Sequence, residues 1–444
     1  MKSRKDIVSI LEKISDKIDD TDYSGYTIQY PPMFIWKKTG GKDVLAGWGG
    51  SLGEYSEKVG LYLHIPFCVK RCNYCRYYSV ELRQYSIKSY VEDLKKEIEM
   101  YSEVFKKLKF KTLYVGGGTP SLLSLVDMKN LFSHVFNKFD LSECEQFVFE
   151  GTSDFLSLDK LKYLQSLGLN RLTLGVQTLD NYILRKVNRF QDNNEFYRCF
   201  KDARKVGIRN INVDLMAGLE GQNFDSFEKT LSRVIKINPD MIHVHPFLPA
   251  VFSEYTREGN IIDNKKRLEI LKMIRYSQLV LKKNGYKETR FDSDAKRKDA
   301  TNLQLSYAIE YNSSYLGLGA GAVSHATGYL RYANIPDVAT YSDFINKKKL
   351  PVKLGYKLTW KDEAVYFISS VLRYKGISKR DFRKLFGRNV EEFFPGDIRD
   401  LEKLGKIRVD ETNIHSLMDG YKDHSIYSKY FYSDKIIKEC LKKM

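Results

Sequence analysis

Short runs of apolar and β-branched residues alternate along the middle of the chain with longer segments in which apolar residues recur every three or four positions. The short runs predict strands, and the longer segments, such as 89–108 and 223–237, predict amphipathic helices. Because parallel neighbouring strands must be joined by a long return segment, the alternation predicts a parallel sheet with helical crossovers. The predicted strands are 61–65, 112–117, 146–151, 171–176, 210–215 and 241–247.

Strand–helix units in such a succession predict an α/β fold, a partial or closed β/α barrel whose functional residues lie at the carboxyl ends of the strands. We place the barrel core at residues 56–345, after an N-terminal extension, 1–55, that ends in a glycine-rich loop at 47–55. From about residue 346 the pattern changes to short helices and a small terminal strand. Residues 346–444 are therefore predicted to form a small, mostly helical C-terminal domain.

The composition is typical of a globular protein of two or three domains: 444 residues, of which 43% are apolar and 29% charged. No apolar run reaches the roughly 18 residues that a membrane-spanning helix needs, so we expect no membrane span. The N-terminus has the pattern of an amphipathic helix rather than of a secretory signal, which indicates a cytoplasmic protein with reduced thiols. A framework of disulfides is therefore not expected.

The net charge is +17, from 73 lysines and arginines against 56 aspartates and glutamates. Such an excess favours anionic partners, including phosphates, carboxylate-bearing small molecules and nucleic acid. The basic residues are spread thinly, however, and a solvated basic surface is the simpler explanation. Since the sequence contains no evident nucleic-acid recognition module, we do not expect nucleic acid as a partner.

Three of the six cysteines lie within eight residues, directly after the first predicted strand, in the spacing C-x3-C-x2-C. These three are Cys68, Cys72 and Cys75. Zinc sites usually offer two separated pairs of ligands, and the other cysteines are isolated, so zinc and unrelated buried thiols are the weaker alternatives. Three thiolates on one loop suit a [4Fe–4S] cluster that leaves one iron without a protein ligand.

An iron without a protein ligand is a place where a substrate or cofactor can coordinate. S-adenosylmethionine is the reagent known to use such a site, through its amine and carboxylate. An electron from the reduced cluster then cleaves the sulfonium and releases a 5′-deoxyadenosyl radical.

The sequence resembles the radical SAM enzymes and, more closely, the branch around oxygen-independent coproporphyrinogen III oxidase. The resemblance covers nearly the whole chain and implies a partial (β/α)6 barrel, a [4Fe–4S] cluster on the three cysteines, and one or two molecules of S-adenosylmethionine. It is carried by YSGYTIQYPP, YLHIPFC, YVGGGTPSLL, FEGTSDFL, LNRLTLGVQTLD, VNRFQD, VDLMAGLEGQ, YLGLGAGAVSH and LRYKGISKRDFRKLFG, in that order.

The resemblance also implies residues that contact S-adenosylmethionine. It places Gly117, Gly118 and Thr119 against the methionyl amine, although glycines after a strand also form simple tight turns. The other implied contacts are Tyr74 with adenine, Glu150 and Gln177 with the methionyl and ribose groups, Arg189 with the methionyl carboxylate, Asp214 with the cofactor pocket, and Gly319 and Ala320 with a second cofactor or the substrate. For Asp214 an exposed carboxylate, and for segment 315–325 a last strand and turn, are the structural alternatives.

Two pairs of residues are candidates for catalysis. Tyr62 and His64 alternate on the first predicted strand and so share one face of it. His243 and His245 face the same way on the sixth strand and could act as acid/base groups or as axial ligands to a heme iron. Each histidine could instead be a buried core residue.

Three differences from the relatives bear on the reaction. Tyr77 stands where the oxidase has a further cysteine, and the N-terminal stretch 23–33 lacks an arginine of the oxidase, which disfavours coproporphyrinogen decarboxylation. Thr301 stands where the heme-chaperone relatives have a histidine. We therefore predict a radical SAM oxidoreductase or methyltransferase that modifies a tetrapyrrole such as heme, with coproporphyrinogen oxidation and heme carriage as alternatives. The electron donor is expected to be of the flavodoxin or ferredoxin type.

Overall fold

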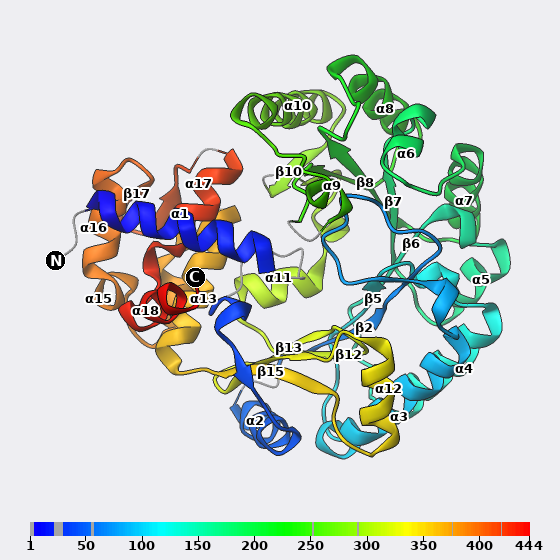
Figure 1. Ribbon diagram of the computed structural model, residues 1–444, viewed down its shortest axis with the longest axis horizontal. Coiled ribbons are helices and arrows are strands. Elements are labelled where there is room, and N and C mark those ends of the chain that lie inside the picture. Colours follow the sequence, from blue (N-terminus) through cyan, green and yellow to red (C-terminus); the bar gives the residue numbers. More distant parts are fainter. Residues whose placement is uncertain are drawn as a thin grey trace.

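The computed structural model is organised around one large curved sheet with helices on its outer side (Figure 1). It describes residues 4–21, 30–54, 57–250, 253–290, 293–374, 376–418 and 420–444. The parallel strands, in sheet order, are β12 (Tyr315–Leu318), β2 (Gly60–Ile65), β5 (Thr112–Gly117), β6 (Gln146–Gly151), β7 (Arg171–Gln177), β8 (Asn210–Ala217) and β9 (Met241–Pro246). The predicted α/β fold with a parallel sheet is confirmed, and every predicted strand is present.

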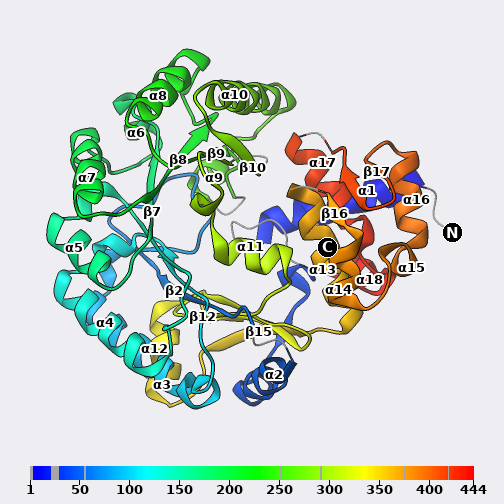
Figure 2. The same cartoon turned by 180° about the vertical axis from the view of Figure 1, so that it is seen from behind.

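The helices that follow the parallel strands cover the outer face of the sheet, as both views show (Figures 1 and 2). They begin at polar caps: the side chain of Ser86 accepts a hydrogen bond from the first turn of the first of them, and Ser124 and Asn223 form capping boxes. Their apolar faces pack on the sheet and form the main core. The helices are α3 (Ile87–Phe105), α4 (Leu125–Lys138), α5 (Leu158–Ser166), α6 (Asn181–Lys186), α7 (Asn193–Lys205), α8 (Phe224–Lys236) and α10 (Asn264–Lys283).

Antiparallel strands extend the sheet at both ends, and among the described strands the order is linear, so the barrel is partial. Beside β9 lie β11 (Ser293–Ala295) and β10 (Lys287–Arg290). Beside β12 lie β13 (Val323–Ala326), β14 (Leu330–Asn334), β15 (Val352–Lys357) and β1 (Lys37–Lys38). β15 thus continues the large sheet past residue 345, while the domain boundaries at 55 and 345 remain predictions.

Segment 47–55 was predicted to be a glycine-rich loop, and this is wrong for its described part, because α2 (Gly41–Glu54) is a helix. Val44, Trp48 and Ser51 recur at helical spacing and are buried, and Trp48 Nε1 donates to the Tyr332 hydroxyl at 2.9 Å. The glycines allow close packing: a Cβ on Gly50 would lie 2.4 Å from the Tyr329 ring. Tertiary packing therefore outweighs the low helix propensity of glycine.

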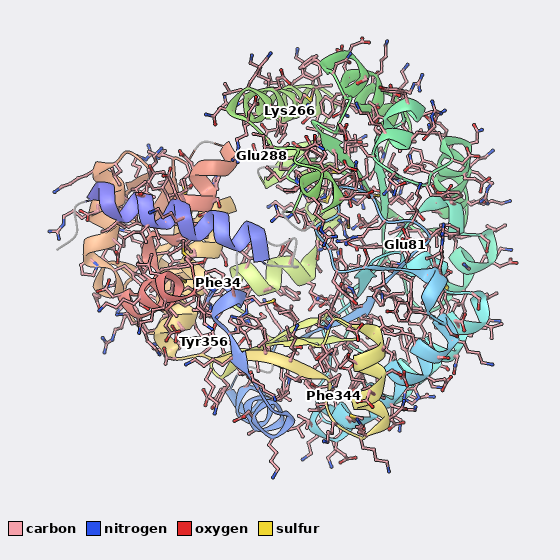
Figure 3. The ribbon with its side chains drawn as sticks, in the orientation of Figure 1. Phe34, Glu81, Lys266, Glu288, Phe344 and Tyr356 are labelled. Atoms are coloured by element: carbon pink, nitrogen blue, oxygen red, sulfur yellow. The ribbon has the colours of Figure 1, made fainter. Side chains whose placement is uncertain are left out.

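A second apolar core lies in the C-terminal region, where the predicted short helices are found with a three-stranded sheet. Its helices are α13 (Trp360–Tyr374), α14 (Lys379–Phe386), α15 (Val390–Phe393), α16 (Pro395–Lys403), α17 (Gly420–Tyr427) and α18 (Asp434–Lys443), and its strands β16 (Ile377–Ser378), β17 (Ile407–Val409) and β18 (Asn413–Ser416). The amphipathic N-terminal helix α1 (Arg4–Thr21) packs against this region (Figure 1). Figure 3 shows Phe34 where the N-terminal segment meets these helices.

Three further helices are α9 (Glu254–Arg257), α11 (Leu303–Glu310), which contacts both β5 and α13, and α12 (Val338–Asn346), which packs against α3. No helix in the described ranges combines the length and the apolar character that crossing a membrane requires. Residues 23–29 of the N-terminal stretch that was compared with the oxidase lie outside the described residues.

Candidate active site at the carboxyl ends of the parallel strands

A cavity of about 660 Å³ opens at the carboxyl ends of the parallel strands and continues to β12–β15, α11 and α13. Most of the predicted site residues line it, although they come from segments far apart in the sequence. They are Tyr62, His64, Cys68, Cys72, Tyr74, Cys75, Gly117, Gly118, Thr119, Glu150, Gln177, Arg189, Asp214, His243 and His245. Tyr77, at the position of the oxidase's further cysteine, also lines it.

The three clustered cysteines lie just after β2. Cys68 ends the short strand β3 (Phe67–Cys68), and Cys72 and Cys75 lie on the loop that leads from it to its partner strand β4 (Val80–Glu81). Two hydrogen-bond donors from other elements point at their sulfur atoms. Thr119 Oγ1 lies 3.5 Å from Cys68 Sγ, and Arg189 Nη1 lies 3.8 Å from Cys72 Sγ. Burial raises the pKa of Cys68 to about 11, so a thiolate here needs such donors or a bound cation.

The thiols do not converge on the position of a single ion. Within the described residues, one set of three metal-ligating side chains has all its ligand atoms within 4.8 Å of one another. That set, described below, does not include the cysteines. The sulfurs of a tetrahedral zinc site would be about 3.8 Å apart, given Zn–S bonds of about 2.3 Å. Three spaced thiols around a cavity therefore fit the corners of an iron–sulfur cube better than a zinc ion.

The glycine loop after β5 lies against the cysteine loop. The backbone N–H of Gly118 donates to the Ile65 carbonyl at 2.8 Å, and that of Thr119 donates to the Phe67 carbonyl at 2.7 Å. Gly117 has a φ of 118°, and a Cβ on Gly118 would lie 2.7 Å from the Phe67 carbonyl oxygen. Glycine is therefore required for this close approach. The contact of these residues with a cofactor remains a prediction.

Polar groups at the ends of β6 and β7 face the same cavity. The Tyr114 hydroxyl donates to Glu150, and burial raises the pKa of that carboxyl to about 7. Gln177 ends β7 with a φ of 67°, a left-handed conformation that is strained for a non-glycine residue. The half-buried Arg189 guanidinium donates to the Gly175 carbonyl beside it.

His64 is held between two neighbours. Its Nε2 lies 3.1 Å from the Tyr78 carbonyl, and its Nδ1 lies 2.8 Å from the Tyr62 hydroxyl. Because a carbonyl can only accept, Nε2 carries the proton, and Nδ1 accepts from Tyr62. Burial lowers the pKa of His64 to about 4, so the ring is neutral near pH 7 and orients the Tyr62 hydroxyl.

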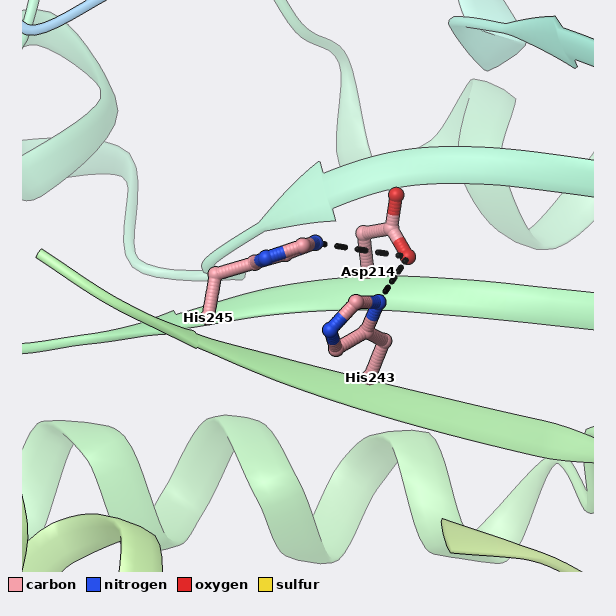
Figure 4. A group of neighbouring side chains, drawn as sticks. All are labelled: Asp214, His243 and His245. Carbon is pink, nitrogen blue, oxygen red and sulfur yellow. Dashed lines mark ion pairs between the residues drawn. The ribbon is translucent and has the colours of Figure 1, made fainter. Parts of the chain in front are cut away.

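Asp214, His243 and His245 form the compact set of ligand atoms mentioned above (Figure 4). Asp214 Oδ1 lies 3.9 Å from His243 Nδ1 and 3.9 Å from His245 Nε2. Asn212 Nδ2 donates to the same carboxylate oxygen at 2.6 Å. Two imidazoles and a carboxylate can hold a divalent transition metal or move a proton.

Gly319 and Ala320 are not among the residues that line the cavity. Their backbone N–H groups donate to buried side chains of α3: Gly319 to Glu97 at 2.7 Å and Ala320 to the Tyr90 hydroxyl at 2.9 Å. Tyr90 in turn donates to the His64 carbonyl at 2.8 Å. These contacts give the two residues a structural role, and their predicted contact with a second S-adenosylmethionine stays a prediction.

Replacing Glu97 with alanine is expected to lower the free energy of unfolding by about 3 kcal/mol and the unfolding midpoint by about 5 °C. The fully buried carboxyl also accepts from Asn334 Nδ2 at 2.6 Å and from the Tyr341 hydroxyl at 2.6 Å. Its removal would therefore leave three buried donors, these two and the Gly319 N–H, without this acceptor. Thermal unfolding measures the effect. The control Glu103→Ala, on the exposed side of α3, should have an unfolding midpoint within about 1 °C of the wild type. Equal decreases of the midpoint in the two variants would contradict the structural role of Glu97.

Sequence reasoning missed several residues of the cavity. Tyr114, Asn212 and Arg331 line it but were not predicted as site residues, although Tyr114 begins the segment YVGGGTPSLL. A signal was present for Asn212, because it precedes Asp214 by two positions and so shares its face of the strand. None was present for Arg331, which belongs to an antiparallel strand added after the repeating units.

Comparison with known proteins agrees with this geometry. Residues 62–234 match the radical SAM superfamily. Over 366 residues the chain is 29% identical to the heme chaperone HemW of Bacillus subtilis, covering 81% of this chain and 95% of that protein. Over 427 residues it is 27% identical to the oxygen-independent coproporphyrinogen III oxidase of Escherichia coli, covering 91% of each.

The solved structure of coproporphyrinogen III oxidase (HemN) from Escherichia coli, described there as a radical SAM enzyme, has the same fold. It superposes with a TM-score of 0.76 at 25% identity and covers 88% of this chain and 93% of that one. The partial barrel, the cysteine loop and these matches define a radical SAM enzyme, a class that carries a [4Fe–4S] cluster and S-adenosylmethionine. Within that class, the chain is similar over most of its length to the HemN-like proteins, which include HemW and HemN.

Proposed function

We propose that this radical SAM enzyme modifies a tetrapyrrole such as heme, by ring opening or methyl transfer. The observation that carries the proposal is the continuity of one cavity from the cysteine loop to an apolar region between the antiparallel strands and α11. A volume of about 660 Å³ is within the range that organic ligands occupy. The names of the relatives, a heme chaperone and a coproporphyrinogen oxidase, point to the same ligand class.

The residues of the chain have separate roles in this proposal. Cys68, Cys72 and Cys75 hold the cluster, and Arg189 and Thr119 donate to its ligands and to the cofactor. When bound, the cluster and S-adenosylmethionine supply one-electron cleavage of a sulfonium and radical chemistry.

On the substrate side, His64 keeps the Tyr62 hydroxyl oriented toward the cavity. Asp214, His243 and His245 take up or deliver a proton. Two alternatives have support of their own. The 29% identity with the heme chaperone HemW favours heme carriage, and the HemN structure favours coproporphyrinogen oxidation, which Tyr77 argues against.

Product analysis tests the proposal. Anaerobically reconstituted protein is mixed with S-adenosylmethionine, a low-potential reductant such as flavodoxin, and either heme or coproporphyrinogen III, and the products are followed by mass spectrometry. We expect 5′-deoxyadenosine to form in a heme-dependent way together with a modified tetrapyrrole. Additional S-adenosylhomocysteine would indicate methyl transfer. Unchanged heme without heme-dependent 5′-deoxyadenosine would support the chaperone, and decarboxylated coproporphyrinogen would support the oxidase.

A further inference from the structure

We propose that Arg331, on β14, binds a propionate carboxylate of the substrate in the part of the cavity formed by β12–β15, α11 and α13. This inference rests on the proposed function, because it takes the ligand to be a tetrapyrrole. It adds a residue that sets which tetrapyrroles bind, namely those with free carboxylates.

The Arg331 guanidinium is buried but not neutralised. The residue is 2% exposed and lines the cavity. Nη1 donates to the Tyr30 carbonyl at 3.2 Å and Nη2 to the Tyr315 hydroxyl at 3.1 Å, and both acceptors are uncharged. The Nε–H is buried and has no hydrogen-bond partner. The group also lies over the Tyr366 ring, 4.5 Å from its centroid, which stabilises a cation without compensating its charge.

The carboxylate whose charge acts on Arg331, Glu363, is already engaged elsewhere. Glu363 lies 3.0 Å from His325 Nε2 and accepts from Asn312 Nδ2 at 3.0 Å and from the Gly328 N–H at 2.6 Å. In the part of the chain that the structure describes, no carboxylate lies within 4.0 Å of the Arg331 guanidinium. A guanidinium is always protonated, so burying it without a counter-ion is unfavourable, and a ligand anion would offset this penalty.

A second unpartnered polar group lines the same part of the cavity. Ser370 is 1% exposed, and its hydroxyl has no hydrogen-bond partner. It lies one helical turn after Tyr366 on α13, so it shares the face that packs over Arg331. The surrounding lining is apolar: Met33, Phe34, Leu305, Ala308, Ile309 and Leu354.

This arrangement selects the chemistry of the ligand. A guanidinium presents its Nε–H and one Nη–H side by side, which matches the two oxygens of a carboxylate. The serine hydroxyl can donate to the same group, and the apolar walls suit a hydrophobic body rather than a free phosphate. A tetrapyrrole, with an apolar macrocycle and propionate side chains, has both parts.

The test is equilibrium binding of heme and of heme dimethyl ester, whose propionates are esterified, to the full-length protein, followed by absorbance. The wild type should bind heme at least about tenfold more tightly than the ester, because only heme offers a carboxylate to Arg331. In Arg331→Gln this preference for heme should disappear. In Arg331→Lys, which keeps the positive charge but loses the two side-by-side N–H donors, the preference should be reduced. The matched control Lys353→Gln removes one positive charge from an exposed residue of the same cavity and should keep the preference.

The outcomes separate this inference from the proposed function. Equal binding of heme and ester by the wild type, a preference that persists in Arg331→Gln and Arg331→Lys, or an equal loss in Lys353→Gln would overturn the role of Arg331 and leave tetrapyrrole binding in place. Binding of neither compound by the wild type would overturn the proposed function and this inference with it.

Discussion

Replacing Cys72 with serine is expected to reduce the iron content from about four atoms per chain to nearly none and to slow cleavage of S-adenosylmethionine at least about 1000-fold. A three-cysteine site has no spare ligand, and the other thiols of the loop cannot hold a cube alone. Arg189 Nη1, 3.8 Å from Cys72 Sγ, would lose the thiolate partner that it faces. Iron analysis, visible absorption and 5′-deoxyadenosine formation after anaerobic reconstitution measure the effect.

The matched control is Cys144→Ser. Cys144 is partly buried like Cys72, but its thiol donates to the Gln146 carbonyl at 3.4 Å and does not line the cavity. This variant should keep about four irons and the wild-type rate. A Cys72→Ser protein that retains a full cluster, or a Cys144→Ser protein that loses it, would contradict the assignment of the three loop cysteines.

The affinity for S-adenosylmethionine is expected to fall about tenfold per pH unit below pH 7 and to level off above it. Burial raises the pKa of Glu150 to about 7, with a further contribution from the charge of Asp214. S-adenosylmethionine carries a sulfonium and an ammonium group, so it favours the ionised carboxylate. Below pH 7 binding must first remove a proton from Glu150, and above pH 7 it need not.

The variant Glu150→Gln tests this directly. It should bind S-adenosylmethionine about 30-fold more weakly at pH 8, because a buried charge-assisted contact is lost, and it should lose the pH dependence between 6 and 8. Equilibrium dialysis with reconstituted protein at several pH values measures both effects. Glu145→Gln, which precedes the same strand and does not line the cavity, serves as the control. A pH dependence that persists in Glu150→Gln would rule Glu150 out as its source.

Local patterns in the sequence were sufficient to predict the repeating strands and helices and the cysteine loop. The alternation of apolar runs with helical segments predicted the parallel strands β2 and β5 to β9 almost to the residue, because strand and helix periodicities are properties of neighbouring positions. The spacing of Cys68, Cys72 and Cys75 is equally local, and polar residues at strand ends, such as Glu150, follow from the rule that parallel strands end at one edge.

Only the tertiary structure decided which distant residues meet. Asp214 lies beside His243 because β8 and β9 pair in that register. Arg331 reaches the cavity because β12, about 250 residues after β2 in the chain, pairs parallel to it and carries β13 and β14 alongside. Segment 47–54 is helical because Trp48 finds a partner in Tyr332. The sequence by itself therefore determined the repeating strands and helices and the cluster motif, whereas the helical state of α2 and the partners of buried polar groups depend on tertiary packing, sheet order and register, which no local periodicity encodes.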